Sequence, residues 1–513
     1  MKILFVDPLG DEVSPGLNMG IAYLTAILKE AGHCVSILDL NLLRDSVEER
    51  LRKAVQAISP DVVGFSVLNL SLKQTILLVN DLKKYYRGYI IAGGAEPSLQ
   101  KENFFNFVDL NAIVVGEGEE TLPEFLDVLS KGGNLDTVRG LIWKDKKNGK
   151  VRINPHRELI KDLDCLPMAN YEAFGVESMD IYPIVTSRGC PHNCSFCSKY
   201  TSQSWRPRDL GKCLDELIYA KNRYGLKSFL VWDSCFNVYP KRIEEFCNLL
   251  VTNKIDLPWV AMGVRADKIT EGMARALKKA NCRTIWVGIE SFDQEVLEAI
   301  GKGEDVEQIV KGIKIAKRSK LGIYGFMIMG LPKDTFKKTI KSLNVALSLN
   351  LDRLFYASAV PFTGTRLYEW VKNNGTFIND PFATSQILHK SKESVAFETK
   401  DFPKEERLKA KKIINIKTGF YENPGFPNWF FFFVKVYLIL RHDLNNSIRR
   451  LVRSFKYRAR KKTAIETIME KRTIKFKHVP DGTWIFPSPK LEENVSSVEI
   501  YYRDLANEKI RKQ

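Results

Sequence analysis

The segment Ser187-Arg-Gly-Cys-Pro-His-Asn-Cys-Ser-Phe-Cys-Ser198 decides how this chain is interpreted, because it places three cysteines in one short run. Cys190, Cys194 and Cys197 follow the spacing Cys-x3-Cys-x2-Cys, and no fourth cysteine stands beside them. Thiolates are the usual ligands of iron–sulfur clusters. Three of them fill three corners of a cubane [4Fe-4S] cluster and leave the fourth iron open to a non-protein ligand, as catalytic zinc sites keep one position open. The sequence therefore predicts that this open iron is where the chemistry takes place.

Two other interpretations of the three cysteines are a zinc loop and a set of packing cysteines. Zinc knuckles tend to pair two Cys-x2-Cys elements, and the chain has no second pair. Cysteines that pack as small hydrophobic residues do not need the turn-forming neighbours Gly189, Pro191 and Asn193. The pattern favours the cluster over both.

This loop, with Phe196 before its last cysteine, resembles the signature of the radical S-adenosylmethionine (SAM) enzymes. Four later segments are similar to the second to fifth strands of that family's barrel: 229–233, 259–267, 286–291 and 325–332. Residues 361–365, Pro-Phe-Thr-Gly-Thr, resemble a segment that follows the sixth strand in the subgroup with an N-terminal cobalamin-type domain. The resemblance implies a partial (β/α)6 barrel over residues 181–375.

The resemblance also implies the reaction. In that family the open iron binds SAM, and one electron from the reduced cluster releases a 5'-deoxyadenosyl radical that abstracts a substrate hydrogen. A reduced ferredoxin or flavodoxin is the expected electron donor. Active sites of barrel enzymes lie at the carboxyl ends of the strands, and the residues there that we expect to bind SAM are Phe196, Asp233, Arg265, Glu290, Ser291, Ile328 and Gly330.

Among these residues, Arg265 would pair with the methionine carboxylate, and Glu290 with Ser291 would bond the ribose hydroxyls. Phe196 and Ile328 would pack on the adenine. The alternative is that Glu290 and Arg265 are ordinary polar residues at strand ends.

The N-terminal third alternates short apolar strands with helical patterns, which predicts a doubly wound parallel sheet of the Rossmann type. We expect strands at 2–7, 34–39, 62–66, 90–94 and 112–116, and a helix at 21–31 that ends at Gly32. This pattern resembles the cobalamin (B12)-binding domain of one radical SAM subgroup, whose cofactor-facing loops would contain Gly93, Gly94, Gly116 and Glu117.

One departure from that subgroup's relatives concerns the cobalt ligand. The motif Asp-x-His-x-x-Gly is absent, and His33 is interpreted as a surface turn residue. The resemblance therefore implies cobalamin without a histidine ligand from the protein; the alternative is a domain that has kept the fold and lost the cofactor.

Four regions follow from these patterns: a cobalamin-type domain (1–137), a hairpin and linker (138–180), the barrel (181–375) and a basic, mostly helical C-terminal region (376–513). The dipeptide Asn148-Gly149 is a strong signal for the turn of the hairpin.

The C-terminal region carries most of the chain's net charge of +17, since residues 401–513 contain 25 Lys and Arg against 13 Asp and Glu. Its apolar run at 429–440 is shorter than the ~20 residues that span a bilayer. Nine basic residues follow between Arg441 and Lys462. An aromatic segment beside a basic face is typical of an interfacial membrane anchor, here 425–465. The interpretation placed slightly ahead of this anchor is a buried helix that caps the barrel, with a solvated basic helix behind it. Contact with nucleic acid is the third interpretation.

Nine cysteines without paired spacing indicate a reducing cytoplasm, and an oxygen-labile cluster favours anaerobic conditions. Six of them are interpreted mostly as packing residues, with a second cluster as the alternative: Cys34, Cys165, Cys213, Cys235, Cys247 and Cys282.

The leading hypothesis is a cobalamin-dependent radical SAM methyltransferase that acts on an unactivated carbon of a small molecule or lipid. The second is a cyclase or oxidase of the same subgroup. The third is a non-catalytic iron–sulfur protein that binds a membrane or a partner through its basic tail.

Overall fold

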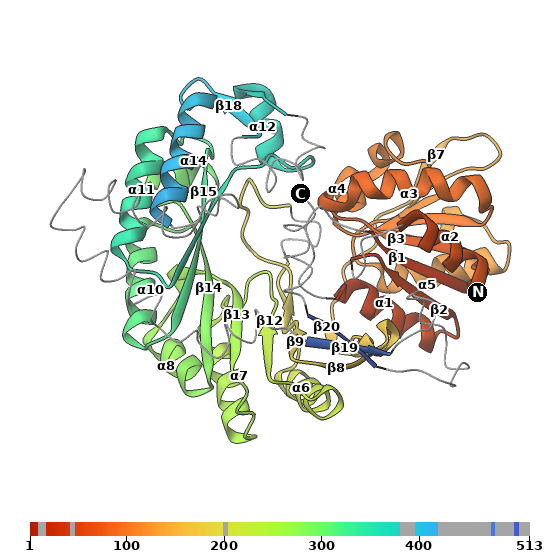
Figure 1. Ribbon diagram of the computed structural model, residues 1–513, viewed down its shortest axis with the longest axis horizontal. Helices are drawn as coiled ribbons and strands as arrows, with labels where there is room; N and C mark the ends of the chain where they lie inside the picture. The colour runs from red at the N-terminus through yellow and green to blue at the C-terminus, as the bar shows by residue number, and fades with distance from the viewer. Residues whose placement is uncertain are drawn as a thin grey trace.

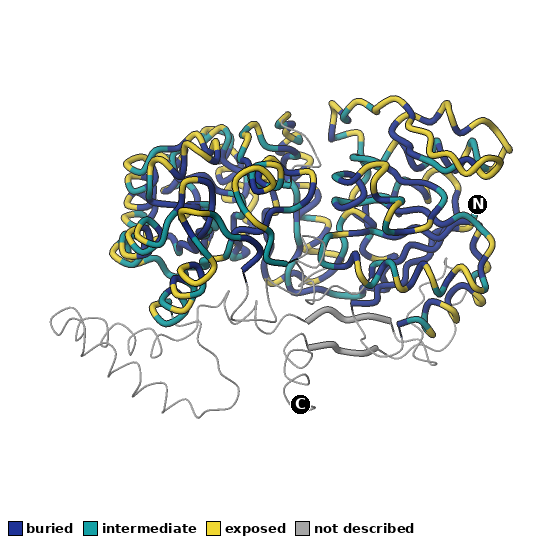
Figure 2. The backbone as a smooth tube through the Cα atoms, turned by 90° about the horizontal axis from the view of Figure 1, so that it is seen from above, coloured by how far each residue is buried: buried dark blue, intermediate teal, exposed yellow. Residues whose placement is uncertain are grey.

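The computed structural model describes residues 1–8, 17–41, 47–198, 204–379 and 395–418, and two strands at 473–477 and 497–501. Two α/β domains lie side by side (Figure 1), and in each of them the buried segments run through the centre (Figure 2).

The N-terminal domain is built on the five parallel strands that the sequence predicts. Their order is β2-β1-β3-β4-β5, and their bounds are β1 (Lys2–Asp7), β2 (Cys34–Asp39), β3 (Val62–Ser66), β4 (Tyr89–Gly93) and β5 (Ala112–Val114). Five helices connect or follow them: α1 (Met19–Glu30), α2 (Val47–Ile58), α3 (Leu72–Tyr85), α4 (Ala95–Gln100) and α5 (Gly118–Ser130). Adjacent residues of one strand, such as Ile3 and Leu4, belong to separate hydrophobic clusters. The sheet is therefore covered on both faces, and the doubly wound fold is confirmed.

The predicted hairpin extends this sheet. Strands β6 (Leu141–Lys144) and β7 (Val151–Ile153) are antiparallel, and β6 pairs with β5. Gly149 has a φ of 70°, which suits the turn between them. The hairpin is therefore the edge of the N-terminal sheet, while the domain limits at 137 and 180 stay predictions.

The second domain is an open barrel of six parallel strands in chain order. They are β9 (Ile181–Ile184), β12 (Ser228–Val231), β13 (Trp259–Val264), β14 (Cys282–Glu290), β15 (Gly322–Met329) and β16 (Arg353–Ser358). The main helices between them are α6 (Leu210–Tyr224), α7 (Pro240–Thr252), α8 (Glu271–Lys279), α10 (Val306–Arg318) and α11 (Phe336–Ser348). The first of these strands, β9, starts at Ile181.

The described part of the C-terminal region is less helical than expected. It contains one helix, α14 (Lys404–Thr418), and the strands β18 (Phe397–Thr399), β19 (Thr473–Lys477) and β20 (Ser497–Tyr501). β18 pairs with β17 (Gly375–Phe377), whereas β19 pairs with β8 (Val176–Met179) and β20. No helix within the described ranges is long and apolar enough to cross a bilayer. The segment proposed for membrane contact, 425–465, lies outside the described residues.

Candidate active site

The cysteine loop starts from a short two-stranded base at the carboxyl edge of the barrel. Strands β10 (Ser187–Arg188) and β11 (Arg206–Pro207) pair antiparallel and bracket the loop. Gly189 has a φ of 82°, a conformation that glycine adopts without strain, and it turns the chain into Cys190.

Asp233 fixes the start of this loop from the strand next to β9. Its carboxylate accepts hydrogen bonds from the Thr186 backbone N (2.7 Å) and from the hydroxyls of Thr186 and Ser187 (2.6 Å each). Asp233 is buried, so these bonds are shielded from water. Its role in the structure is to position the loop, and the SAM contact predicted for it stays a prediction.

The rest of the loop rests on two helix ends. The Ser195 N donates to the carbonyl of Ile300 (2.8 Å) at the end of α9 (Gln294–Ala299), and its carbonyl accepts from the Leu367 N (2.9 Å) of α12 (Arg366–Asn374). Arg366 also donates to the carbonyl of Asn193. The β10–β11 pair, Asp233 and the ends of α9 and α12 therefore hold the backbone that carries the three sulfurs.

The three cysteines suit a cluster better than a single ion. Cys190 and Cys194 are half-buried and Cys197 is exposed. A single zinc ion holds its ligands about 2–2.3 Å from one metal atom. A cubane spreads its thiolates over several iron atoms, so three sulfurs spaced around one loop fit a [4Fe-4S] cluster.

A buried network of charges lies at the carboxyl ends of β13 and β14. The Lys302 ammonium is 3.2 Å from Glu290 Oε1 and 3.7 Å from Glu304 Oε2. Arg265 Nε is 3.0 Å from Asp267 Oδ1 and 3.5 Å from Glu304 Oε1. Gly288 leaves room for this network, since a Cβ there would lie 2.7 Å from Glu290 Oε1.

The network changes what is expected of Arg265. Its guanidinium also donates to the carbonyls of Lys302 (2.9 Å) and Gly303 (3.0 Å), so protein groups already occupy it. Lys302 and Glu304 are residues that the sequence analysis missed, because they follow α9 in a loop where no strand register singles them out. Burial lowers the pKa of Lys302, but Glu290 and Glu304 outweigh burial and raise it.

Two other predicted SAM contacts have partners within the protein. The Ser291 hydroxyl accepts from the Asp293 N (3.1 Å) and lies 3.3 Å from Ser342 Oγ. Gly330 has a φ of 81°, and a Cβ there would lie 2.2 Å from Arg407 Nη1 of α14. Glycine is therefore required at this position by packing, whatever else binds nearby.

Phe196 and Ile328 are both half-buried and pack against the main hydrophobic core. The adenine contacts assigned to them stay predictions.

The glycines predicted to face cobalamin lie at the carboxyl edge of the N-terminal sheet. Gly93 ends β4, and a Cβ on Gly94 (φ 99°) would lie 2.9 Å from the Val67 carbonyl oxygen. Gly116 (φ 77°) follows β5, and its N donates to Ser98 Oγ (2.9 Å). This is the edge where doubly wound sheets bind ligands.

Glu117 connects this edge to the base of the cysteine loop. Its carboxylate accepts from Arg206 (2.7 and 2.9 Å), from Arg188 (3.4 Å) and from the Ile160 N (3.0 Å). Burial raises the pKa of Glu117, but the bonds from Arg206 and the charge of Arg188 outweigh it, so the net pKa is lowered. The structure thus places this predicted cofactor residue between the two domains.

The interpretation of His33 as a surface residue is wrong. The side chain is buried, with Nδ1 3.3 Å from the N-terminal nitrogen of Met1 and Nε2 4.0 Å from Asp127. It stands at the amino end of β2, because the turn after α1 folds back under the sheet. That edge is opposite to Gly94 and Gly116.

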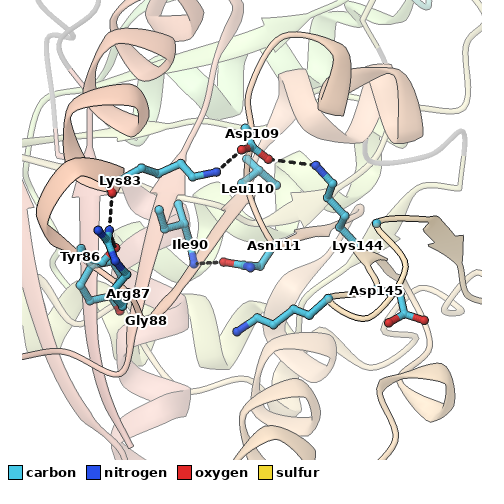
Figure 3. Close-up of a pocket in the computed structure, with 12 residues that line it drawn as sticks. Lys83, Tyr86, Arg87, Gly88, Ile90, Asp109, Leu110, Asn111, Lys144 and Asp145 are labelled. Carbon is cyan, nitrogen blue, oxygen red and sulfur yellow. Dashed lines mark hydrogen bonds and ion pairs between the residues drawn. The ribbon is translucent and has the colours of Figure 1, made fainter.

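A surface pocket of about 310 Å³ also lies at the amino ends of β4 and β5 (Figure 3). Lys83 and Lys144 both contact Asp109 there, and the Asn111 side chain accepts from the Ile90 N (2.7 Å). The pocket is therefore separate from the predicted cofactor edge.

Comparison with known proteins decides the family. The family model of the radical SAM superfamily matches residues 184–346, and that of the B12 binding domain matches residues 13–126. An uncharacterised methyltransferase of Pyrococcus horikoshii is 31% identical over 390 residues, which are 73% of this chain and 84% of the relative. This chain belongs to the radical SAM superfamily.

Other relatives and solved structures agree with this assignment. The anaerobic magnesium-protoporphyrin IX monomethyl ester cyclase of Rubrivivax gelatinosus is 24% identical, over 72% of this chain and 70% of the relative. The fold resembles the radical SAM methyltransferase TsrM of Kitasatospora setae, with a TM-score of 0.62 and 18% identity over 72% of this chain and 76% of that chain. It also resembles the cobalamin-dependent enzyme OxsB, with a TM-score of 0.57 and 22% identity over 67% and 51%.

This radical SAM protein is an enzyme, and its two family models imply a [4Fe-4S] cluster, SAM and cobalamin as its cofactors. When bound, the reduced cluster supplies the electron that cleaves the sulfonium of SAM. The chain's own residues fix the cysteine loop through Asp233 and the ends of α9 and α12, and the network of Lys302, Arg265 and their carboxylate partners lies at the same edge of the barrel.

Proposed function

We propose that this enzyme methylates an unactivated carbon of an apolar small molecule or lipid, with cobalamin as the methyl carrier. The observation that carries the proposal is that the ligand-binding edges of the two domains face each other (Figure 1). Gln100 at the end of α4 donates to Thr363 Oγ1 after β16, and Glu117 after β5 binds Arg206. A methyl carrier and a hydrogen-abstracting radical must reach the same carbon, and two facing edges allow that.

The inner face of the barrel supports an apolar substrate. On β14, Ile285, Val287 and Ile289 pack outward in the main core, so Trp286 points inward. Its ring centroid is 5.4 Å from that of Phe326, which stacks on Phe355 at 4.8 Å. Leu230, Val260 and Met262 continue this surface on the neighbouring strands. Such a lining excludes water, which favours the lifetime of a carbon radical.

The predicted residues keep their roles in this proposal. Cys190, Cys194 and Cys197 bind the cluster, and Phe196, Ile328 and the strand-end residues surround SAM. Lys302 lies between Glu290 and Glu304 and keeps the Glu290 side chain in place at this edge.

The partners belong to the same proposal. A reduced ferredoxin or flavodoxin supplies the electron, and the basic segment 425–465 brings the cytoplasmic enzyme to anionic membranes. Co-sedimentation with phosphatidylserine liposomes, with and without residues 425–465, tests the membrane contact: equal binding by both chains would contradict it.

The central experiment is anaerobic reconstitution with SAM, dithionite and cobalamin. Methyl transfer predicts both 5'-deoxyadenosine and S-adenosylhomocysteine, and omitting cobalamin should abolish only the second product. If 5'-deoxyadenosine forms without S-adenosylhomocysteine under all conditions, the enzyme is a non-methylating cyclase or oxidase. If neither forms, the catalytic assignment fails.

A further inference from the structure

The surface pocket at the amino ends of β4 and β5 is assembled from segments that are far apart in the chain (Figure 3). Its lining comes from the end of α3, from the segments before β4 and β5, and from the end of β6 with the turn that follows. Pockets that bind small molecules have volumes of roughly 300–1,000 Å³. The volume of this pocket, about 310 Å³, is therefore sufficient for a small ligand.

Three lysines from three different elements line the pocket. Lys83 lies in the last turn of α3, Lys144 ends β6, and Lys146 lies in the turn between β6 and β7. The side chains of Lys83 and Lys144 are 43% and 42% exposed. The Lys146 ammonium lies 3.8 Å from the centroid of the Tyr89 ring, and this residue is also exposed. All three ammonium groups are thus accessible to a ligand in the same pocket.

Two other charged residues that line the pocket have structural roles. The Arg87 guanidinium donates to three backbone carbonyls at the end of α3, where it satisfies acceptors that the helix leaves open. The Asp145 carboxylate is 3.1 Å from Arg152 of the neighbouring strand β7. These two side chains therefore fix the walls of the pocket and do not compete for a ligand.

Asp109 links two of the three lysines. Its Oδ1 is 3.1 Å from Lys144 Nζ, its Oδ2 contacts Lys83, and both lysines point toward it (Figure 3). Three ammonium groups and this one carboxylate give the pocket a net charge of +2. A phosphate monoester carries a charge of about −1.5 to −2 at pH 7, and lysine binds phosphate as a point charge. The charge of the pocket therefore matches a phosphate monoester, and Asp109 is its internal competitor.

Apolar side chains line the pocket beside the lysines. They are Tyr86, Ile90 and Leu110. Sites for small organic molecules combine such apolar walls with a few polar groups that fix the orientation of the ligand. This lining suits the organic part of a phosphate monoester better than it suits inorganic phosphate.

We propose that this pocket binds a small organic phosphate monoester, whose phosphate group contacts the three lysines and whose organic part lies against Tyr86 and Leu110. The pocket is at the edge of the N-terminal sheet opposite to Gly94 and Gly116, so it is separate from the predicted cobalamin contacts. The proposal goes beyond the methylation proposed above and does not depend on it.

The test is calorimetric titration of the reconstituted full chain in phosphate-free buffer, with phenyl phosphate, inorganic phosphate and phenol as probes. Phenyl phosphate should bind more tightly than inorganic phosphate, and phenol should not bind. Lys83→Ala and Lys144→Ala should each weaken the binding of phenyl phosphate about twofold to fivefold, which is the contribution of an exposed charge pair. Lys131→Ala removes an exposed lysine of the same domain outside the pocket and should leave the affinity unchanged.

Asp109→Asn should change the affinity in the opposite direction. The two lysines lose their competing carboxylate, so phenyl phosphate should bind more tightly than it does to the wild type. A misfolded variant cannot produce such a gain. Glu102→Gln makes the same change of net charge at an exposed position outside the pocket and should leave the affinity unchanged.

Four results would overturn the proposal: no binding of phenyl phosphate to the wild type, equal affinities for phenyl phosphate and inorganic phosphate, equal weakening in Lys131→Ala and Lys144→Ala, or no gain in Asp109→Asn. These titrations need neither SAM nor a methyl acceptor. Their failure is therefore distinguishable from a failure of the proposed methylation, which would show only in the missing S-adenosylhomocysteine.

Discussion

Asp233 accepts three short hydrogen bonds from the two residues that precede the cysteine loop, and it is buried. Glu117 and Ser291 likewise bind protein groups. At the scale of single residues, the polar side chains around the loop thus fix the positions of the cysteines. An open cluster requires this accuracy, because protein ligands fill only three of its four corners.

Replacing Asp233 should therefore weaken the loop before it affects chemistry. We expect Asp233→Ala to leave buried donors of Thr186 and Ser187 unpaired, at about 1–3 kcal/mol for each unsatisfied group, and to lower iron retention after reconstitution. Urea unfolding of the apoprotein and iron analysis measure the two effects. Asp215→Ala, on an exposed position of α6, is the control, and equal iron in all three proteins would contradict the role given to Asp233.

Glu304 makes a pH-dependent contribution to stability. Burial raises its pKa to about 7, opposed by Lys302 and assisted by a hydrogen bond with Asp267. The native state therefore keeps a proton that the unfolded state releases near pH 4.5, and stability falls as the pH rises between these two values. Glu304→Gln lacks this titration. The free energy of unfolding of the variant should therefore increase relative to that of the wild type as the pH is raised from 5 to 8.

Urea midpoints of the apoprotein at both pH values measure this change. Glu307→Gln on the exposed side of α10 is the matched control, because it removes a carboxylate outside the Lys302 network. A constant difference for Glu304→Gln would show that Glu304 does not hold the proton.

The cysteines could be singled out because their spacing is local, whereas Lys302 and Glu304 could not. Lys302 and its partner Glu290 are separated by 12 residues in the sequence, and Arg206 and its partner Glu117 by 89. Such pairs form only when the chain folds, so no local pattern indicates them. Asp233 and Glu117 were singled out as cofactor residues, which stays a prediction, and their bonding partners within the protein could not be inferred from the sequence.

At the scale of elements, α14 covers the carboxyl end of β15. Arg407 of α14 is buried between the rings of Phe397 and Phe402, with its guanidinium 4.3 and 4.9 Å from their centroids. It also donates to the Gly330 carbonyl (3.3 Å). The first turn of this helix is acidic and its last turn is basic, which suits the helix dipole.

A side chain at Gly330 should displace α14. Gly330→Ala combines a left-handed backbone, which costs about 1–2 kcal/mol for a residue with a Cβ, with a contact of 2.2 Å to Arg407. Gly132→Ala carries the same backbone strain in open space, so it isolates the contribution of the contact. In thermal unfolding, Gly330→Ala should have a clearly lower melting temperature than Gly132→Ala. Equal melting temperatures would mean that α14 can shift away from the new side chain without loss of stability.

The strands of both domains were predictable because buried parallel strands are short apolar runs between polar turns. The hairpin was predictable from Asn148-Gly149, but its pairing with β5 was not, since edge pairing depends on the whole sheet. The strands β19 and β20 lie in a region expected to be helical, and β19 pairs with β8 almost 300 residues earlier in the chain. Contacts at that separation leave no local signal.

At the scale of the whole molecule, two carboxylate-centred contacts join the domains. Glu117 and Glu119 pair with Arg188 and Arg206 at distances of 2.7–3.4 Å, and all four side chains are mostly buried. Gly364 of the barrel also lies against the Leu99 carbonyl of α4, where a Cβ would lie 3.1 Å from that oxygen. The base of the cysteine loop and the cobalamin edge thus share one set of contacts.

Breaking this network should loosen the two domains from each other. Glu117→Gln leaves Arg206 without a buried counter-charge, a loss of roughly 3–5 kcal/mol for such pairs. Calorimetry of the apoprotein should show the unfolding of the two domains more widely separated in temperature than in the wild type. Glu120→Gln alters an exposed carboxylate 3.5 Å from Arg157 and should leave this separation unchanged. An unchanged separation in Glu117→Gln as well would show that the network does not couple the two domains.

The central claim is an iron–sulfur cluster held by Cys190, Cys194 and Cys197 with one iron open to SAM. The most direct measurement is the electron paramagnetic resonance (EPR) spectrum of the dithionite-reduced, reconstituted enzyme before and after SAM is added. The account predicts a changed spectrum in the wild type and no [4Fe-4S] signal once all three cysteines are replaced by alanine. A spectrum that SAM leaves unchanged, or a cluster that survives the triple replacement, would contradict it.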